Sequence, residues 1–374
     1  MCRTDGEINL RRPLGVQAGA FTTGDCELKQ AALLDGLVRR VPFTVARRLL
    51  IDSGFPSGHG WDAVMEKLKD KSVAAKTNTA ALSSLYVQAL AATQKRVSIY
   101  KVSRKSLSAI DAGLTGNHAA NSNNAIVSAY PLPLTDAQIQ IVKANDPVVA
   151  GMVAWPRGRL FVLSYVKEVR ERIAIAPSQI SGLVGSPLKE AYGIRIQRVQ
   201  VFDALIVSNH DDRLIMLTDI LDSHSQESVR DSVSRVTRFL EKSTRVSLKG
   251  TRINLFSAIS PFYQDPDVNV ISIDHLTPDG RAVTEKVKGD QVCVREGDFH
   301  KGGMAASGTT DAFGITVAWK IPTVGNATAY VELSIDGPTS LAHALNPNIE
   351  FATLTKAATT QELAIALRSL NDKV

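Results

Sequence analysis

Acidic residues are absent from one long stretch of this chain. No Asp or Glu lies between Lys71 and Ile110, although the whole sequence holds 37 acidic and 43 basic residues. The stretch contains seven cations: Lys71, Lys76, Lys95, Arg96, Lys101, Arg104 and Lys105. A stretch of one charge sign attracts polyanions, because binding releases the counterions that surround them. We therefore predict that this span contributes to a basic surface.

Cysteine and long apolar runs are also scarce, and each absence excludes a class of protein. The three cysteines, Cys2, Cys26 and Cys293, are odd in number and far apart, so we expect no disulfide framework. No stretch reaches the ~18 uninterrupted apolar residues that a membrane-spanning helix needs, and the first residues lack the apolar core of a secretory signal. We expect a soluble, cytoplasmic protein with no membrane partner.

The overall composition is that of a globular protein and excludes a disordered chain. Of the 374 residues, 44% are apolar and 21% are charged, which is sufficient for a sizeable core. The length favours two or three domains. A formal net charge of +6 is compatible with a nucleic-acid partner but does not require one.

The hydrophobic pattern changes at Lys95. Before this residue, apolar side chains recur at helical spacing in residues 27–38, 45–53, 61–69 and 72–93. From Lys95 onward they alternate with polar residues, which is typical of a strand. The predicted organisation is a flexible arm at residues 1–25, an all-α helical bundle at 26–94 and an α+β domain at 95–374.

Turn signals divide the second half of the chain into hairpins. Paired apolar segments flank Pro156–Arg159, Asn209–Asp212, Thr277–Gly280 and Val324–Asn326. We also expect a loop at 113–124 and amphipathic helices at 225–242 and 360–370. Hairpins outnumber strand–helix–strand units, so the expected fold class is α+β with an antiparallel or mixed sheet and covering helices.

Eight basic residues are the candidate nucleic-acid contacts. Five come from the acid-free stretch and three share one side of the helix expected at 225–242; they are Lys95, Arg96, Lys101, Arg104, Lys105, Arg235, Arg238 and Lys242. Tyr86 and Tyr100 are nearby aromatic residues that could stack on bases. The competing interpretation is a solvated face whose cations are balanced by carboxylates from elsewhere in the fold.

No motif identifies an enzyme, so catalytic residues stay unknown and no metal or cofactor is expected. The segment Gly303–Gly308 has the glycine spacing of a phosphate-binding loop, but Thr309 stands where the lysine is required. We expect a flexible loop there, which could act as a lid. Cys293 and His300 form the one Cys/His neighbourhood, and five acids cluster further upstream: Asp265, Asp267, Asp274, Asp279 and Glu285.

Three functional hypotheses follow from these observations. The first is a non-enzymatic binding protein whose basic surface contacts a polyanion, nucleic acid above all, and whose bundle at 26–94 binds a protein partner or a second copy. The second is a metal-dependent hydrolase or nuclease, with the five acids converging in the β-rich half. The third is an assembly subunit without a ligand. Fold analogy alone cannot decide among them.

Overall fold

Helices and a large antiparallel sheet make up the fold, which is of the α+β class. The computed structural model describes residues 23–74, 76–143, 146–156, 158–176, 178–180, 189–208, 211–220, 226–290, 292–307, 311–322 and 328–374. The predicted arm at 1–25 lies outside these residues, except for its last three, which begin the first helix. Among the described helices, none has the length and apolar character needed to cross a membrane.

The N-terminal part of the described chain is helical. Its helices are α1 (Thr23–Arg40), α2 (Phe43–Asp52), α3 (Trp61–Leu68), α4 (Lys71–Ala74) and α5 (Thr79–Ala92). The single helix expected at 72–93 is wrong, because α4 ends at Ala74 and Asn78 starts a new helix. Its side chain accepts a hydrogen bond from the backbone N–H of Ala81 at 2.9 Å, which caps α5.

Ten strands form one antiparallel sheet in the described part of the chain. They are β1 (Lys95–Lys101), β2 (Val148–Trp155), β3 (Gly158–Ile175), β4 (Ala191–Ser208), β5 (Arg213–Asp219), β6 (Asn269–Leu276), β7 (Ala282–Lys286), β8 (Asp311–Pro322), β9 (Thr328–Asp336) and β10 (Ala352–Thr355). Their order is β2-β3-β4-β5-β1-β10-β9-β8-β6-β7. The register confirms all four hairpin pairings expected from the turn signals.

The sheet consists of two halves of five strands that meet between β1 and β10. β1 pairs with β5 along its whole length, from Lys95↔Asp219 to Lys101↔Arg213. It pairs with β10 over three positions only, from Lys95↔Leu354 to Val97↔Ala352. The contact between the two halves of the sheet is therefore short.

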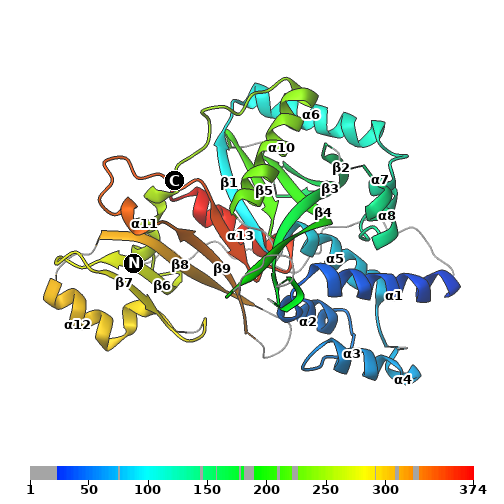
Figure 1. Ribbon diagram of the computed structural model, residues 1–374, viewed down its shortest axis with the longest axis horizontal. Helices are drawn as coiled ribbons and strands as arrows, with labels where there is room; N and C mark the ends of the chain where they lie inside the picture. The colour runs from blue at the N-terminus through cyan, green and yellow to red at the C-terminus, as the bar shows by residue number, and fades with distance from the viewer. Residues whose placement is uncertain are drawn as a thin grey trace, which may run out of the picture.

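Helices cover both faces of the first half-sheet. On one face, α6 (Arg104–Ala120) and α10 (Gln226–Thr244) lie side by side, and their apolar residues pack on Leu205 and Met216. Figure 1 shows this pair above the strands, with α1–α5 grouped on the opposite side of the molecule. The loop expected at 113–124 is wrong, since α6 runs through most of it. Leu107, Ile110 and Leu114 give α6 the buried stripe of a helix.

The other face of the sheet is covered by α1–α5 and by α13 (Thr360–Asn371). Leu37 and Leu82 from these N-terminal helices, Val97 from β1 and Leu367 from α13 belong to one continuous apolar cluster. The helices within 26–94 therefore share their core with the sheet. The boundary at residue 94 stays a prediction.

The remaining helices are short. They are α7 (Ala125–Ala129), α8 (Asp136–Ile141), α11 (Ile259–Gln264) and α12 (Asp298–Ser307). The flexible loop expected at Gly303–Gly308 is wrong for its first five residues, which complete α12. Gly308 lies outside the described residues.

β3 and β4 are much longer than their neighbours. They pair with each other from Gly158↔Ser208 to Ile175↔Ala191. β2 accompanies β3 only as far as Ser164, and β5 accompanies β4 only from Ala204. The outer parts of β3 and β4 therefore form a two-stranded ribbon beyond the sheet.

Gly158, the first residue of β3, lies too close to β4 to carry a side chain. A Cβ there would come within 2.2 Å of the backbone oxygen of Val207. We expect Gly158→Ala to lower the free energy of unfolding by about 1–3 kcal/mol through overpacking. Gly116→Ala is the control, because its Cβ meets nothing within 4 Å in α6 and alanine favours the helix. Urea unfolding of both variants measures the difference; equal stabilities would contradict it.

Candidate functional site

Lys95 lies in the core, which removes it from any exposed basic surface. Its ammonium donates to the carboxylate of Asp219 at 2.8 Å and to the backbone oxygen of Phe202 at 2.6 Å, and its side chain is 1% exposed. Arg40, the last residue of α1, binds the same carboxylate. Burial alone would raise the pKa of Asp219, but Lys95 and Arg40 lower it to about 2.

A second buried carboxylate, Asp203 of β4, lies next to this cluster. It accepts hydrogen bonds from the backbone N–H of Asp219 at 2.8 Å and from the hydroxyl of Tyr165 at 2.9 Å. Burial raises the pKa of Asp203 to about 6. Burial also lowers the pKa of Lys167, whose ammonium donates to the Ser232 hydroxyl at 2.8 Å. These groups are buried between β3, β4 and α10, and they contribute nothing to the exposed surface.

The other four predicted contacts in the acid-free stretch differ in exposure. Arg96 is half-buried and donates to the hydroxyl of Thr353 in β10. Lys101, Arg104 and Lys105 are exposed where β1 passes into α6. Arg104 forms a long ion pair of 3.4 Å with Asp212. Of the five predicted contacts in this stretch, only these last three are exposed.

The aromatic residues expected near this surface are buried. Tyr86 is 0% exposed and Tyr100 is 2% exposed, so neither can stack on a base. That part of the sequence prediction is wrong. Both rings fill space between helices and the sheet, as large rings in cores do.

Carboxylates partly neutralise the three basic residues of α10. Arg235 pairs with Asp231 one turn earlier at 2.8 Å, and Lys242 pairs with Asp146 at 3.3 Å. Arg238 is exposed and has no ion-pair partner among the described residues. The interpretation as a solvated face with mixed charge therefore describes α10 well.

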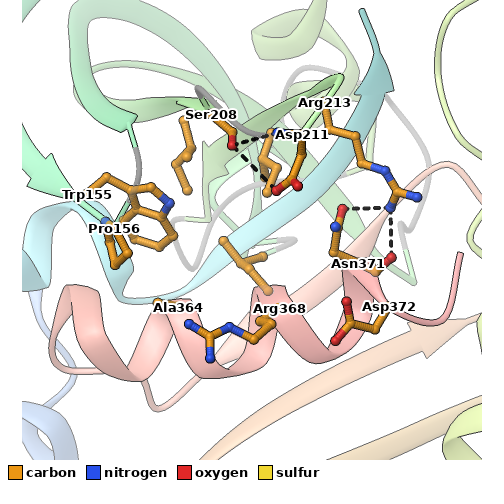
Figure 2. A pocket seen from close by; sticks show the side chains of 12 residues that line it. Trp155, Pro156, Ser208, Asp211, Arg213, Ala364, Arg368, Asn371 and Asp372 are labelled. Atoms are coloured by element: carbon orange, nitrogen blue, oxygen red, sulfur yellow. Dashed lines mark hydrogen bonds between the residues drawn. The ribbon is translucent and has the colours of Figure 1, made fainter. Parts of the chain in front are cut away.

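A cavity of about 420 Å³ lies at the end of the first half-sheet, where β2 turns into β3 and β4 turns into β5. α13 closes its other side. Its floor is apolar and includes Ile206, Ile215 and Leu367. Figure 2 shows Trp155 and Pro156 at one end of the cavity and Arg213 with Asn371 at the other.

Two arginines line this cavity and differ in how firmly they are held. Arg213 donates to the side-chain oxygen of Asn371 at 2.6 Å and to the backbone oxygens of Asn371 and Val374. Arg368 is exposed, extends from α13 toward the Trp155 end, and has no ion-pair partner within the described part of the chain. Arg368 is therefore available to an anion that enters the cavity.

The exposed cations of the acid-free stretch adjoin the cavity. Lys101 lies directly opposite Arg213 in the β1–β5 register, so both side chains lie on the same face of the sheet. Arg104 pairs with Asp212, the residue between Asp211 and Arg213. Asp211 and Asp372 place two carboxylates on the cavity wall among these cations. The lining thus balances two arginines with two carboxylates, and Lys101 and Arg104 lie beyond it.

The Cys/His neighbourhood forms a hydrogen-bonded cluster, although not around the cysteine. His300 Nδ1 lies 2.9 Å from the Glu285 carboxylate, and its Nε2 lies 2.7 Å from the Tyr263 hydroxyl. Burial raises the pKa of Tyr263, which makes its hydroxyl a poor nucleophile. Cys293 is buried and accepts a hydrogen bond from Arg295 at 3.2 Å. These contacts join α11, α12 and β7.

The five acids considered for metal chemistry are dispersed. Asp265 pairs with Lys373, Asp279 pairs with Arg281 in its turn, and Glu285 belongs to the His300 cluster. Asp274 accepts from the Thr284 hydroxyl and Asp267 is exposed. In the described ranges, no three His, Cys, Asp or Glu side chains are grouped so that they could hold a metal ion.

Comparison with protein-family models and with curated proteins finds no relative of this chain. A scan against protein-family models matches no family, and a search of curated proteins finds no significant match.

Sequence reasoning missed the cavity residues. Trp155 ends the β2 segment, but Arg213 and Arg368 are separated from it by dozens of residues and belong to no motif. One usable signal was present, namely that Trp155 directly precedes the turn at Pro156–Arg159. Aromatic residues at turns carry binding functions more often than aromatic residues within strands.

The buried position of Lys95 predicts a large effect on stability. Lys95→Gln should lower the free energy of unfolding by about 3–5 kcal/mol, because it leaves the Asp219 carboxylate buried with one cationic partner fewer. Lys105→Gln is the matched control at an exposed position and should change it by less than about 0.5 kcal/mol. Thermal and urea unfolding check both values. A Lys95 variant as stable as the control would disprove the buried pair.

Asp203 predicts a distinctive pH dependence. Its pKa is higher in the folded protein than the ordinary 3.8, so the folded state binds more protons between pH 4 and 6. Ionised Asp203 therefore costs stability above pH 6, and this cost disappears as the pH falls toward 4. We expect the free energy of unfolding of Asp203→Asn to rise by about 3 kcal/mol relative to that of wild type between pH 4 and pH 8. Urea unfolding across this range tests the sign; a constant difference would refute it.

Proposed function

We propose that the protein binds single-stranded nucleic acid, with one base in the cavity against Trp155 and the adjoining phosphates near Arg368 and Lys101. The observation that carries this proposal is the combination of an aromatic ring and two guanidinium groups around one cavity. Proteins that bind single strands pair a basic groove with aromatic rings, because every base offers a face for stacking.

The dimensions and polarity of the cavity support a base as the ligand. Small-molecule sites occupy roughly 300–1,000 Å³ and combine apolar walls with a few polar groups. The cavity of about 420 Å³ falls within this range, and its lining mixes apolar side chains such as Ile206 with a larger polar part. Asp211 and Asp372 supply acceptors that suit the amino groups on base edges, whereas phosphate alone would be repelled by them.

The exposed cations support a nucleic-acid strand that continues beyond the cavity. Lys101, Arg104 and Lys105 lie on the β1–α6 side, and Arg368 lies on the α13 side. A nucleic-acid strand that contacts the cations on both sides would pass over the mouth of the cavity. We assign no contact to Lys95 or Arg96, since Lys95 is buried and Arg96 is bound within the sheet.

The predicted adaptor role of residues 26–94 and the nuclease alternative stay hypotheses. The apolar faces of the helices in 26–94 are used in the core that they share with the sheet. The acids of the nuclease hypothesis are engaged in separate contacts. The binding proposal requires neither.

Fluorescence anisotropy with labelled single-stranded oligonucleotides of mixed sequence tests the proposal. Wild type should bind, and its affinity should fall steeply with salt because phosphate contacts release counterions. Trp155→Ala should weaken binding about 5- to 150-fold, since stacking contributes roughly 1–3 kcal/mol per base. Arg368→Gln should weaken binding to all sequences alike and reduce the salt slope by about one.

Lys320→Gln is the control, because Lys320 is an exposed cation on β8 in the other half-sheet. It should bind as wild type does. Duplex of the same sequence should bind more weakly than the single strand, because its bases are not free to enter the cavity. The proposal is wrong if wild type shows no salt-dependent binding, or if Trp155→Ala binds with unchanged affinity.

A further inference from the structure

The ribbon formed by β3 and β4 exposes three large apolar side chains on one strand. Tyr192, Ile194 and Ile196 of β4 are 47%, 66% and 61% exposed. Residues two apart on a strand point to the same face, so the three form a row. Such rows are uncommon on monomeric surfaces unless another molecule covers them.

The outer edge of β4 is also open beside this row. β5 pairs with β4 only from Ala204 to Val207, and within the described residues no other strand pairs with the outer edge of β4. An open edge presents unpaired backbone N–H and C=O groups, which are a template for a further strand. The row and the open edge coincide along Ala191–Val199.

The row is complementary to itself when two copies run antiparallel. With Ile194 placed opposite Ile194 of a second copy, Tyr192 lies opposite Ile196, and Ile196 lies opposite Tyr192. Two residues further out, Glu190 lies opposite Arg198, so opposite charges meet at both ends. All these pairs fall on one face, as antiparallel pairing requires.

We propose that a second copy of this chain pairs along the outer edge of β4, with a two-fold axis at Ile194. The interface is isologous, because both copies contribute the same residues and the two strands run in opposite directions. The two ribbons then form one four-stranded sheet, which is more stable than a ribbon of two strands. This inference does not depend on the proposed nucleic-acid site.

The side chains of the row are already held in place for this pairing. The guanidinium of Arg172 lies 3.7 Å from the centre of the Tyr192 ring, and the Tyr192 hydroxyl donates to Glu190 at 2.7 Å. Arg198 donates to the backbone oxygens of Gln140 and Val142, and it has no carboxylate within ion-pair distance among the described residues. These bonds leave its positive charge without a neutralising carboxylate next to the position of Glu190 of the second copy.

Analytical ultracentrifugation of three variants tests the pairing. Wild type should reach the mass of a dimer as its concentration rises. Ile194→Lys and Ile194→Glu should each remain at half that mass, because like charges would face each other across the axis. An equal mixture of the two variants should recover the dimer, since lysine then faces glutamate. Leu345→Lys, at a 99% exposed aliphatic position, is the matched control and should dimerise as wild type does.

Cysteine cross-linking tests the register independently. Ile194→Cys should form a disulfide between copies under mild oxidation, because residues directly opposite in an antiparallel pair lie ~4.5–5.5 Å apart at Cα. Ile196→Cys should form none, since its counterpart lies four residues away along the strand.

The proposal is overturned by a wild type that stays monomeric at every concentration, by a dimeric Ile194→Lys, or by a mixture of charged variants that fails to associate. Circular dichroism of each variant confirms its fold.

Discussion

The buried contact of Lys95 with Asp219 is the constraint on which much of the molecule depends. It joins the first residue of β1 to the last residue of β5, and Arg40 brings the end of α1 to the same carboxylate. A charge that is buried without a partner costs several kcal/mol, so these elements must assemble together. The position of the N-terminal helices on the sheet is therefore set by charge as well as by apolar packing. Asp203 lies next to this cluster, and its ionisation in a buried position lowers the stability of the folded protein.

The candidate site lies at the opposite end of the same strands and depends on their rigidity. Arg213 is fixed by three hydrogen bonds to the end of α13, while Ile206 and Ile215 form a flat apolar floor. Arg368 extends along α13 toward the Trp155 end of the cavity and has no ion-pair partner among the described residues. Regular elements hold a binding site more accurately than loops do. The arrangement thus combines a firmly held arginine, Arg213, with an exposed one, Arg368, that an incoming ligand can reach.

The parts of the fold that could be predicted from sequence are those specified by neighbouring residues. The β6–β7 hairpin follows from Thr277–Gly280, where Gly280 adopts a φ of +82° that suits glycine. The course of α6 through 113–124 was missed, because its polar, Asn-containing segment outweighed the apolar stripe beginning at Leu107. Burial of Lys95 could not be read locally, since its carboxylate partner is 124 residues away. The cavity could not be predicted for the same reason, because its walls come from three segments that are far apart in the sequence.

The short pairing between β1 and β10 also affects how the chain folds. These strands lie near opposite ends of the sequence, yet their three paired positions join the two halves of the sheet. During synthesis on the ribosome, β1 must wait for more than two hundred further residues before its second neighbour emerges. Pairings of such large sequence separation are slow, because a long loop must close first. Until then the Lys95–Val97 part of this edge lacks its strand partner, and a nascent chain at that stage is exposed to misassociation with its neighbours.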